Sequence, residues 1–414
     1  MIKKLLKSLL FLVLAIPVLF RRNHPVFSET PPSSQKPGWK RWLVMSAVLL
    51  VLMHLGGFLV ATEGIISIKA SSGHWAVTRW FLNFAKERSV TTHTLGKKAP
   101  PLDAPWMAVK GATHYETGCR SCHGSPDTPQ PHVAKRMTPP PPSLASINSK
   151  FEPVELFYII KHGIKFTGMP AWPAEKRDDE VWAMVAFLLI YPEMGPADYP
   201  RLALGETTQP LDAPIRDLLP PEKAPQAISE SCARCHGPDG LGRGVGAFPK
   251  LAGQKPDYIL ASLHAYASGK RSSGIMEPIA AGLSAEAMRE LAEYYGKLTR
   301  SNRFEQPQND PAAIERGRRI AQNGIPNQKV PACLECHSKS IPRNSKYPVL
   351  SGQYPEYLIL QLDLFNKKVR GGTPYSHLMH FVAGGLTTAQ MSDVAEYFGS
   401  LSTESEVSRL SREQ

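Results

Sequence analysis

The chain has 414 residues, a formal net charge of +12 and six cysteines, with 42% hydrophobic and 20% charged residues. This composition excludes a disordered chain and a protein wholly embedded in a membrane. Residues 1–41 carry +7, residues 42–110 carry +4 and residues 111–414 carry +1, so the basic excess fits membrane topology better than a phosphate-binding surface, and no nucleic-acid partner is expected.

Residues 1–41 form a basic segment that is partly apolar. Its apolar stretch, 5–20, contains Lys7 and Pro17 and has no small-residue cleavage site after it. A signal, an interfacial segment and a spanning segment all remain open for it. We favour a segment that does not span, because a cleaved signal would reverse the orientation of everything downstream.

Residues 42–62 predict a transmembrane helix. Trp42–Ala61 is a 20-residue stretch without a formal charge, and a helix of that length spans about 30 Å, the thickness of a bilayer core. Three basic residues at 36–41 precede it. We therefore expect a single-pass protein of the bacterial inner membrane with its main body on the periplasmic side. His54 is expected to be a packing residue, because one helix offers no second ligand.

The six cysteines form three Cys-x-x-Cys-His motifs, and none is left over. The motifs are Cys119, Cys122 and His123; Cys232, Cys235 and His236; and Cys333, Cys336 and His337. This is the attachment signal of c-type haem, in which two thiols bond to the porphyrin and the histidine binds the iron. A zinc site would need four ligands where each motif supplies three, and a redox dithiol does not need the histidine. We expect three covalently attached haem c groups.

The chain beyond the membrane segment divides into three small haem domains and their connections. They are a juxtamembrane linker at 63–106, the first haem domain at 107–192, a Pro-rich linker at 193–223, the second haem domain at 224–303, the third at 304–403 and a polar tail at 404–414. The expected fold is all-α. Because such units are small for a self-sufficient core, the porphyrin supplies the apolar centre.

The second and third units repeat one another. Leu251-Ala-Gly-Gln254 matches Leu350-Ser-Gly-Gln353, and Pro256-Asp-Tyr-Ile259 matches Pro355-Glu-Tyr-Leu358. Apolar residues at i, i+3, i+4 and i+7 predict a closing amphipathic helix in each copy, after Ser284 and after Thr387. In the first unit the closing helix is expected to begin at the acidic residues 178–180, which suit a helix N-terminus.

One methionine in each unit is a candidate sixth iron ligand. Met169, Met276 and Met379 follow the motif histidines by 46, 40 and 42 residues, and each is expected in a loop before the closing helix. Met184, Met288 and Met391 are expected to fill the core. Met137 competes in the first unit. His377 and His380 leave bis-histidine ligation open in the third.

The residues between each histidine and its methionine supply candidate supporting groups. Carbonyls near Pro141, Pro249 and Pro348 are candidate acceptors for the second ring nitrogen of the motif histidines. Alternatively, these prolines only shape loops. Lys270-Arg271 is either a partner for haem propionates or a solvated charge run.

These motifs resemble the class I c-type cytochromes. The second and third units, roughly 224–403, look like the soluble di-haem cytochromes of the c-four group, through Cys232-Ala-Arg-Cys235-His236-Gly-Pro-Asp-Gly240, Leu-Ala-Gly-Gln254 and the Met276 loop. In the third unit Ser338 replaces the glycine after the histidine. The first unit is similar to mono-haem domains with a Gly-Met-Pro-Ala-Trp ligand loop. The resemblance implies three class I cytochrome c domains in tandem and an electron-carrier role.

The resulting hypothesis is a membrane-anchored tri-haem electron carrier, without substrate chemistry at its haems. Its expected donor is a quinol-oxidising complex or a periplasmic dehydrogenase, its acceptor a terminal oxidase or a soluble cytochrome, and its anchor contacts membrane lipid. One alternative is a cytochrome subunit of a larger dehydrogenase or oxidase complex. The other is a peroxidase-type haem enzyme, which needs one open iron, against which three methionine ligands argue.

Overall fold

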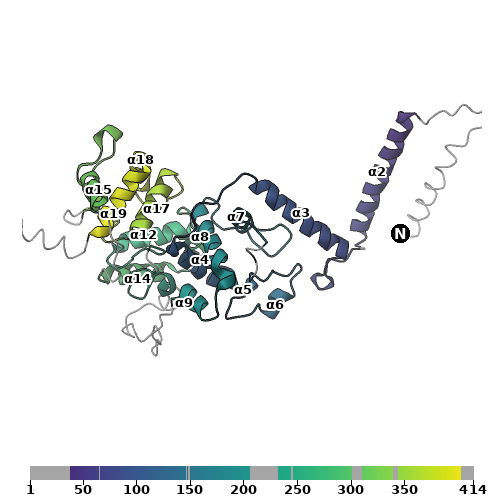
Figure 1. The fold of residues 1–414 in the computed structure, drawn as a ribbon, viewed down its shortest axis with the longest axis horizontal. Coiled ribbons are helices and arrows are strands. Elements are labelled where there is room, and N and C mark those ends of the chain that lie inside the picture. The colour runs from purple at the N-terminus through teal and green to yellow at the C-terminus, as the bar shows by residue number, and fades with distance from the viewer. Residues whose placement is uncertain are drawn as a thin grey trace, which may run out of the picture. The chain divides into compact units, whose positions relative to one another are not determined.

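The computed structural model describes residues 38–64, 66–145, 147, 150–205, 232–243, 246–300, 310–338 and 344–401. The chain divides into two compact units, Met1–Ile68 and Lys69–Gln414. Within the described ranges the regular structure is helical, apart from one isolated bridge between Ile325 and Val330 (Figure 1). The all-α prediction is confirmed. The predicted apolar stretch at 5–20, most of the Pro-rich linker and the polar tail lie outside the described residues.

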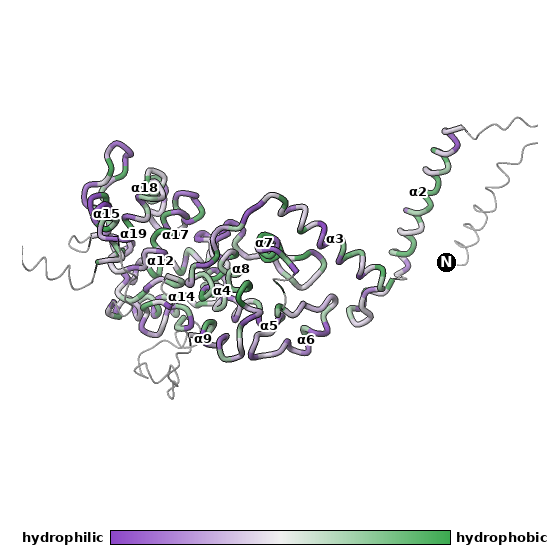
Figure 2. The backbone as a smooth tube through the Cα atoms, viewed as in Figure 1, coloured by the Kyte–Doolittle hydropathy of each residue, from purple (hydrophilic) through white to green (hydrophobic). Residues whose placement is uncertain are grey.

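The unit Met1–Ile68 contains one long apolar helix, α2 (Trp39–Thr62). It has a mean hydropathy of 2.4 over its most apolar window, and Figure 2 shows hydrophobic residues along its length. Its 24 residues correspond to about 36 Å. This is the one helix among the described residues that is long and apolar enough to cross a bilayer. The His54 ring lies 2.7 Å from the Leu50 carbonyl of the preceding turn.

The region expected to be a juxtamembrane linker contains a helix, α3 (Ala76–Thr94). Val90 and Thr94 at its C-terminal end are buried. Thr91 donates a hydrogen bond to Glu155 at 2.9 Å, and the His93 ring stacks on Tyr158. The end of α3 is therefore packed against the first haem domain. A short 3₁₀ turn, η1 (Ala70–Ser72), precedes it.

The first haem domain is built on two crossing helices. Its elements are α4 (Pro105–Gly118), α5 (Arg120–His123), α6 (His132–Lys135), α7 (Pro153–His162), α8 (Asp178–Ile190), η3 (Tyr191–Glu193) and α9 (Asp198–Leu204). Helices α4 and α8 cross at Gly111, where a Cβ would collide with the Ala183 carbonyl. As predicted, α8 begins at Asp178. Part of the expected Pro-rich linker belongs here, since Tyr199 and Ala203 of α9 are in the core.

The second and third haem domains share one plan. The second has α11 (Ala233–His236), α12 (Pro256–Ala267), α13 (Met276–Ala281) and α14 (Ala285–Lys297), and the third has α15 (Pro311–Asn323), η5 (Pro326–Gln328), α16 (Leu334–His337), α17 (Pro355–Asn366), α18 (Ser376–Gly384) and α19 (Thr388–Ser400). Both predicted closing helices are confirmed, and in the structure each has a side-chain N-cap. Ser284 accepts from Ala287 N–H, and Thr387 forms a capping box with Gln390.

The methionines expected in the core are there. Met184, Met288 and Met391 are each at most 4% exposed and lie in the apolar clusters of the first, second and third domains respectively. The three candidate ligands Met169, Met276 and Met379 are half-buried. The three domain cores are thus closed by the helices that the apolar periodicity predicts.

Candidate functional site

Each Cys-x-x-Cys-His motif forms one short helical turn. The turns are α5, α11 and α16, and each begins directly after the first cysteine of its motif. In the first motif Cys122 N–H and His123 N–H both donate to the Cys119 carbonyl at 3.0 Å. None of the six cysteines forms a disulfide. A single turn brings the two thiols and the histidine toward one face, as attachment to one porphyrin requires.

Each motif histidine is fixed through one ring nitrogen. Its Nδ1 lies at hydrogen-bonding distance from a proline carbonyl, at 3.0 Å for His123 and Pro142, 3.1 Å for His236 and Pro249, and 2.9 Å for His337 and Pro348. Because a carbonyl only accepts, Nδ1 carries the proton and Nε2 is left as a metal ligand. The predicted acceptors are confirmed at Pro249 and Pro348. In the first domain the acceptor is Pro142, one residue beyond the predicted Pro141, whose carbonyl binds the Gln130 amide.

Burial favours the neutral form of all three imidazoles. Desolvation lowers the pKa of His123, of His236 and of His337 below the ordinary histidine value, against the smaller opposing effect of the proline carbonyls. A neutral imidazole is the form that binds iron. The sites are therefore ready for coordination at neutral pH.

A cavity of about 580 Å³ lies between the second and third domains. Its walls are mostly apolar side chains. The candidate haem-binding residues that line it come from both domains and are Cys235, His236, Met276, Cys333, Cys336, His337 and Met379. The two sites therefore open into one shared space, which suits two large apolar ring systems held close together.

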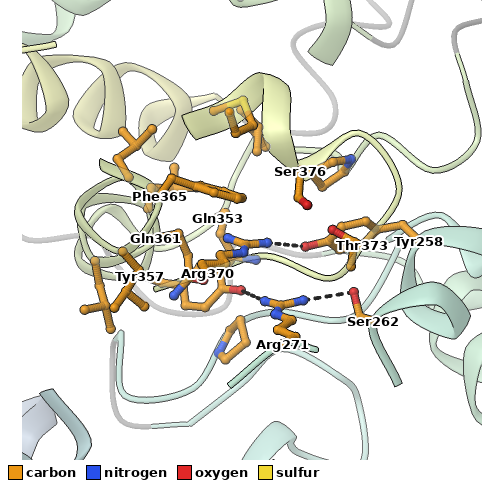
Figure 3. Close-up of a pocket in the computed structure, with 18 of the residues that line it drawn as sticks. Tyr258, Ser262, Arg271, Gln353, Tyr357, Gln361, Phe365, Arg370, Thr373 and Ser376 are labelled. Atoms are coloured by element: carbon orange, nitrogen blue, oxygen red, sulfur yellow. Dashed lines mark hydrogen bonds between the residues drawn. The ribbon is translucent and has the colours of Figure 1, made fainter. Parts of the chain in front are cut away.

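Two buried arginines face this cavity. Arg271 is 5% exposed and Arg370 is 8% exposed. Figure 3 shows them donating across the domain boundary, Arg370 to Tyr258 at 2.7 Å and Arg271 to Tyr357 at 3.5 Å. Among the described residues neither forms an ion pair with a carboxylate, and Arg370 Nε has no hydrogen-bond partner.

Buried cations of this kind need a counter-charge. Haem propionates are anionic and would supply it, so the residues present fit the group. Of the pair Lys270-Arg271, Arg271 is buried and lines the cavity, whereas Lys270 is exposed.

The repeated glutamines join the second and third domains reciprocally. Gln254 donates to the Val349 carbonyl at 3.1 Å and accepts from Val349 N–H at 2.7 Å. Gln353 makes the same two bonds to Lys250, each at 3.0 Å. Lys250 and Val349 directly follow the proline carbonyls that hold His236 and His337. Each domain therefore braces the segment that orients the other domain's histidine.

The candidate sixth ligands are not all in loops. Met169 is, but Met276 is the first residue of α13 and Met379 lies inside α18. The prediction of a loop was wrong at Met276 and Met379 because helices of six and nine residues are too short to show apolar periodicity.

The competing ligands are placed as follows. His380 Nε2 lies 2.6 Å from the Arg370 carbonyl, while His377 lines the cavity together with Met379. In the first domain the Met137 methyl group lies against Gly168, the neighbour of Met169.

Sequence reasoning missed the residues that act across a domain boundary. Arg370, Tyr258 and Tyr357 were not singled out, although Arg271 and Arg370 are separated by the same 99 positions as Tyr258 and Tyr357 and as the matched Leu-x-Gly-Gln motifs. Tyr258 and Tyr357 already lie in the matched Pro-x-Tyr motifs, and extending the repeat alignment from there would have found Arg370. From the sequence, Glu180 was identified only as an acidic residue at a helix N-terminus, and its contact with the second domain was missed.

Two stretches of the chain match known families. Residues 107–188 match the family described as cytochrome c oxidase, cbb3-type, subunit III, and residues 222–302 match the cytochrome c family. The chain is 35% identical over 179 residues to the thiosulfate dehydrogenase electron acceptor of Thiomonas intermedia (strain K12), covering 43% of this chain and 79% of that protein.

Two further relatives are cytochromes by name. Cytochrome c-552 of Acidithiobacillus ferridurans is 34% identical over 186 residues, covering 43% of this chain and 76% of that protein. Cytochrome c4 of Pseudomonas aeruginosa is 29% identical over 180 residues, covering 43% and 87%. With the three attachment motifs and the fitting cavity, these similarities show that the chain belongs to the class I c-type cytochromes and carries di-haem domains of the cytochrome c4 type.

Proposed function

We propose that this electron-transfer cytochrome carries three haem c groups and is anchored in the membrane. The observation that carries the proposal is the threefold recurrence of one arrangement, a Cys-x-x-Cys-His turn whose histidine is fixed through Nδ1 by a proline carbonyl. His123, His236 and His337 are the proposed proximal ligands. Met169, Met276 and Met379 are the proposed distal ligands. The first haem domain is proposed at 105–204, beyond the predicted 107–192, and the other two are proposed at 224–303 and 304–403.

The chain's own residues would make these sites carriers rather than reaction centres. Haem iron supplies reversible one-electron chemistry when bound. With a histidine and a thioether both bound, the iron would have no coordination position for a substrate, and the thioether would also raise the reduction potential. The apolar cavity walls exclude water. Fixed imidazole orientation limits rearrangement when the charge changes.

Membrane anchoring is supported by two apolar features. Helix α2 has the length and hydropathy of a membrane span. In α3, which begins 14 residues after the end of α2, Trp80 and Phe81 are 65% and 56% exposed, and Trp75 just before it is 75% exposed. Exposed aromatic rings of this kind suit a bilayer interface. The basic residues before α2 support a periplasmic position for the haem domains.

The partners are proposed from the relatives' names and from the anchor. A relative named as the electron acceptor of thiosulfate dehydrogenase favours a periplasmic dehydrogenase as donor, and an anchor also favours a membrane quinol-oxidising complex. The acceptor would be a terminal oxidase or a soluble cytochrome. The same relative supports the second candidate, a cytochrome subunit of a larger dehydrogenase complex. Co-purification from detergent separates the two.

The test is a haem count with a ligand-binding assay on the mature protein. Three covalent haems per chain are expected, and a ratio of two or fewer contradicts the proposal. The reduced protein is expected to bind little carbon monoxide because all three irons are capped. Strong binding at one haem would instead favour a peroxidase-type enzyme, and the proposed ligand Met379 at the third iron would be the first place to look.

A further inference from the structure

The first haem domain contacts the second through one buried carboxylate. Glu180, on the first turn of α8, has a side chain that is 1% exposed. It accepts from Ser273 Oγ at 2.6 Å and from Gly274 N–H at 2.7 Å, both in the second domain. These partners are 93 and 94 positions away in sequence. The contact therefore belongs to the junction of the two domains.

The segment that is hydrogen-bonded to Glu180 leads into Met276. Ser273 Oγ donates to Glu180 and itself accepts from Met276 N–H at 3.1 Å and from Ile275 N–H at 3.3 Å. The backbone of the proposed iron ligand is thus two hydrogen bonds away from a carboxylate of the neighbouring domain. Nearby, Arg177 donates to the Ser272 carbonyl at 2.8 Å.

The same carboxylate also fixes the ligand loop of its own domain. Trp172, three residues after Met169, donates its indole N–H to Glu180 at 3.1 Å. Its ring lies so close to Gly274 that a Cβ there would collide with it. Glu180 therefore connects the loop after Met169 with the loop before Met276.

The charge on Glu180 is balanced within the first domain. Arg177 forms ion pairs with Glu180 at 3.0 Å and with Asp179 at 2.8 Å, and Lys110 pairs with Asp179 at 3.3 Å. Lys110, Arg177 and Glu180 also line the cavity shared by the second and third sites. A carboxylate that is paired this closely accepts strong, charge-assisted hydrogen bonds.

We propose that Glu180 is a positioning residue for the second haem site: it holds the Met276 loop from the first domain and thereby fixes the junction through which electrons pass between the first haem and the di-haem pair. The inference rests on the proposed ligand role of Met276. It makes the first domain a structural part of the second haem site and not only a tethered neighbour. An isolated di-haem unit would lack this support.

The test compares Glu180→Ala with Asp393→Asn in the full-length holoprotein. Asp393 is the matched control, because it is a buried carboxylate on the closing helix of the third domain, paired with Arg316 at 2.7 Å inside its own domain. The readouts are the sulfur-to-iron charge-transfer band of the oxidised protein, carbon monoxide binding to the reduced protein, and the resolved haem potentials.

Glu180→Ala is expected to remove the band intensity of one haem, to open that haem to carbon monoxide and to lower one potential, while all three haems stay attached. Asp393→Asn should leave the band and the carbon monoxide binding unchanged. Equal band intensity in Glu180→Ala and wild type would overturn the proposal. If Glu180→Ala does not fold, Ser273→Ala removes only the hydroxyl that joins Glu180 to Met276 and should give the same change to a smaller extent. An unchanged band there is equally contradictory.

Met276→Ala separates this inference from the proposed function. Loss of one haem's band in Met276→Ala but not in Glu180→Ala would mean that the ligand assignment holds and the positioning role fails. No loss in Met276→Ala would mean that the ligand assignment itself fails.

Discussion

At the residue scale, two neighbouring cations have opposite surroundings. Arg271 is buried and donates to Ser262 at 2.9 Å, whereas Lys270 is exposed. A buried positive charge beside a redox centre stabilises the added electron, and solvent screens an exposed one. The pair therefore separates the effect of burial from the effect of charge alone.

Arg271→Gln is expected to lower the midpoint potential of a haem at the shared cavity and to destabilise the fold by about 1–3 kcal/mol, because Ser262 and Tyr357 lose a donor. Lys270→Gln should change stability by no more than about 0.5 kcal/mol. Redox titration and urea unfolding of both variants provide the comparison. Similar shifts of the midpoint potential in both variants would show that the burial of Arg271 does not determine its effect on the haem.

His114 makes the first domain sensitive to acid. Burial and, to a lesser extent, Lys110 lower the pKa of His114 to about 4, and Arg234 lies with it around one small pocket. Its Nδ1 has no hydrogen-bond partner among the described residues, and its ring packs on Trp172. The folded state therefore holds the neutral ring.

Because the unfolded histidine titrates near pH 6.5, the unfolded chain takes up the proton first as the pH falls. The stability that His114 contributes is complete above about pH 6.5 and is lost as the pH falls toward 4, by at most about 3 kcal/mol. Urea midpoints at pH 7.5 and pH 5 should differ less in His114→Gln than in wild type. The same pH dependence in both proteins would rule this histidine out as the cause.

At the element scale, the first and third domains each contain two helices that cross closely at a glycine. Helices α15 and α19 cross at Gly317, where a Cβ would collide with the Asp393 carbonyl, just as α4 and α8 cross at Gly111. The Arg316–Asp393 ion pair spans the same crossing. Backbones this close leave no room for a side chain, so the crossing itself selects glycine.

Gly317→Ala is accordingly expected to destabilise the third domain by about 1–3 kcal/mol or more through overpacking. Gly282→Ala is the control, since a Cβ there meets its nearest atom at an ordinary 3.5 Å. Thermal unfolding measured by circular dichroism checks both. A melting temperature in Gly317→Ala as high as that of the control would argue against the tight crossing.

At the scale of the whole molecule, the proposed membrane helix and the proposed haem domains belong to separate units. The boundary falls after Ile68. Replacing residues 1–68 by a cleavable export signal is therefore expected to release a water-soluble protein that keeps three haems, while the full-length protein fractionates with membranes. Fractionation and haem content measure this. Loss of haem on truncation would show that the two units depend on each other.

The chemistry and the local structure could be predicted from the sequence. The attachment motifs and the closing helices after Ser284 and Thr387 depend on neighbours within about ten positions. The repeat of the second and third domains is visible when the sequence is aligned with itself. Capping, helical periodicity and motif spacing act over that range, so they are readable without a fold. The carbonyls of Pro249 and Pro348 were predictable for the same reason.

The contacts by which the domains support one another could be found only from the fold. The bonds of Gln254 to Val349, of Arg370 to Tyr258 and of Glu180 to Gly274 join residues 94 to 112 positions apart. No local rule predicts such partners, because they are set by which domain faces pack together. Burial then decides whether a charged residue is solvated, as at Lys270, or becomes part of a haem site, as at Arg271.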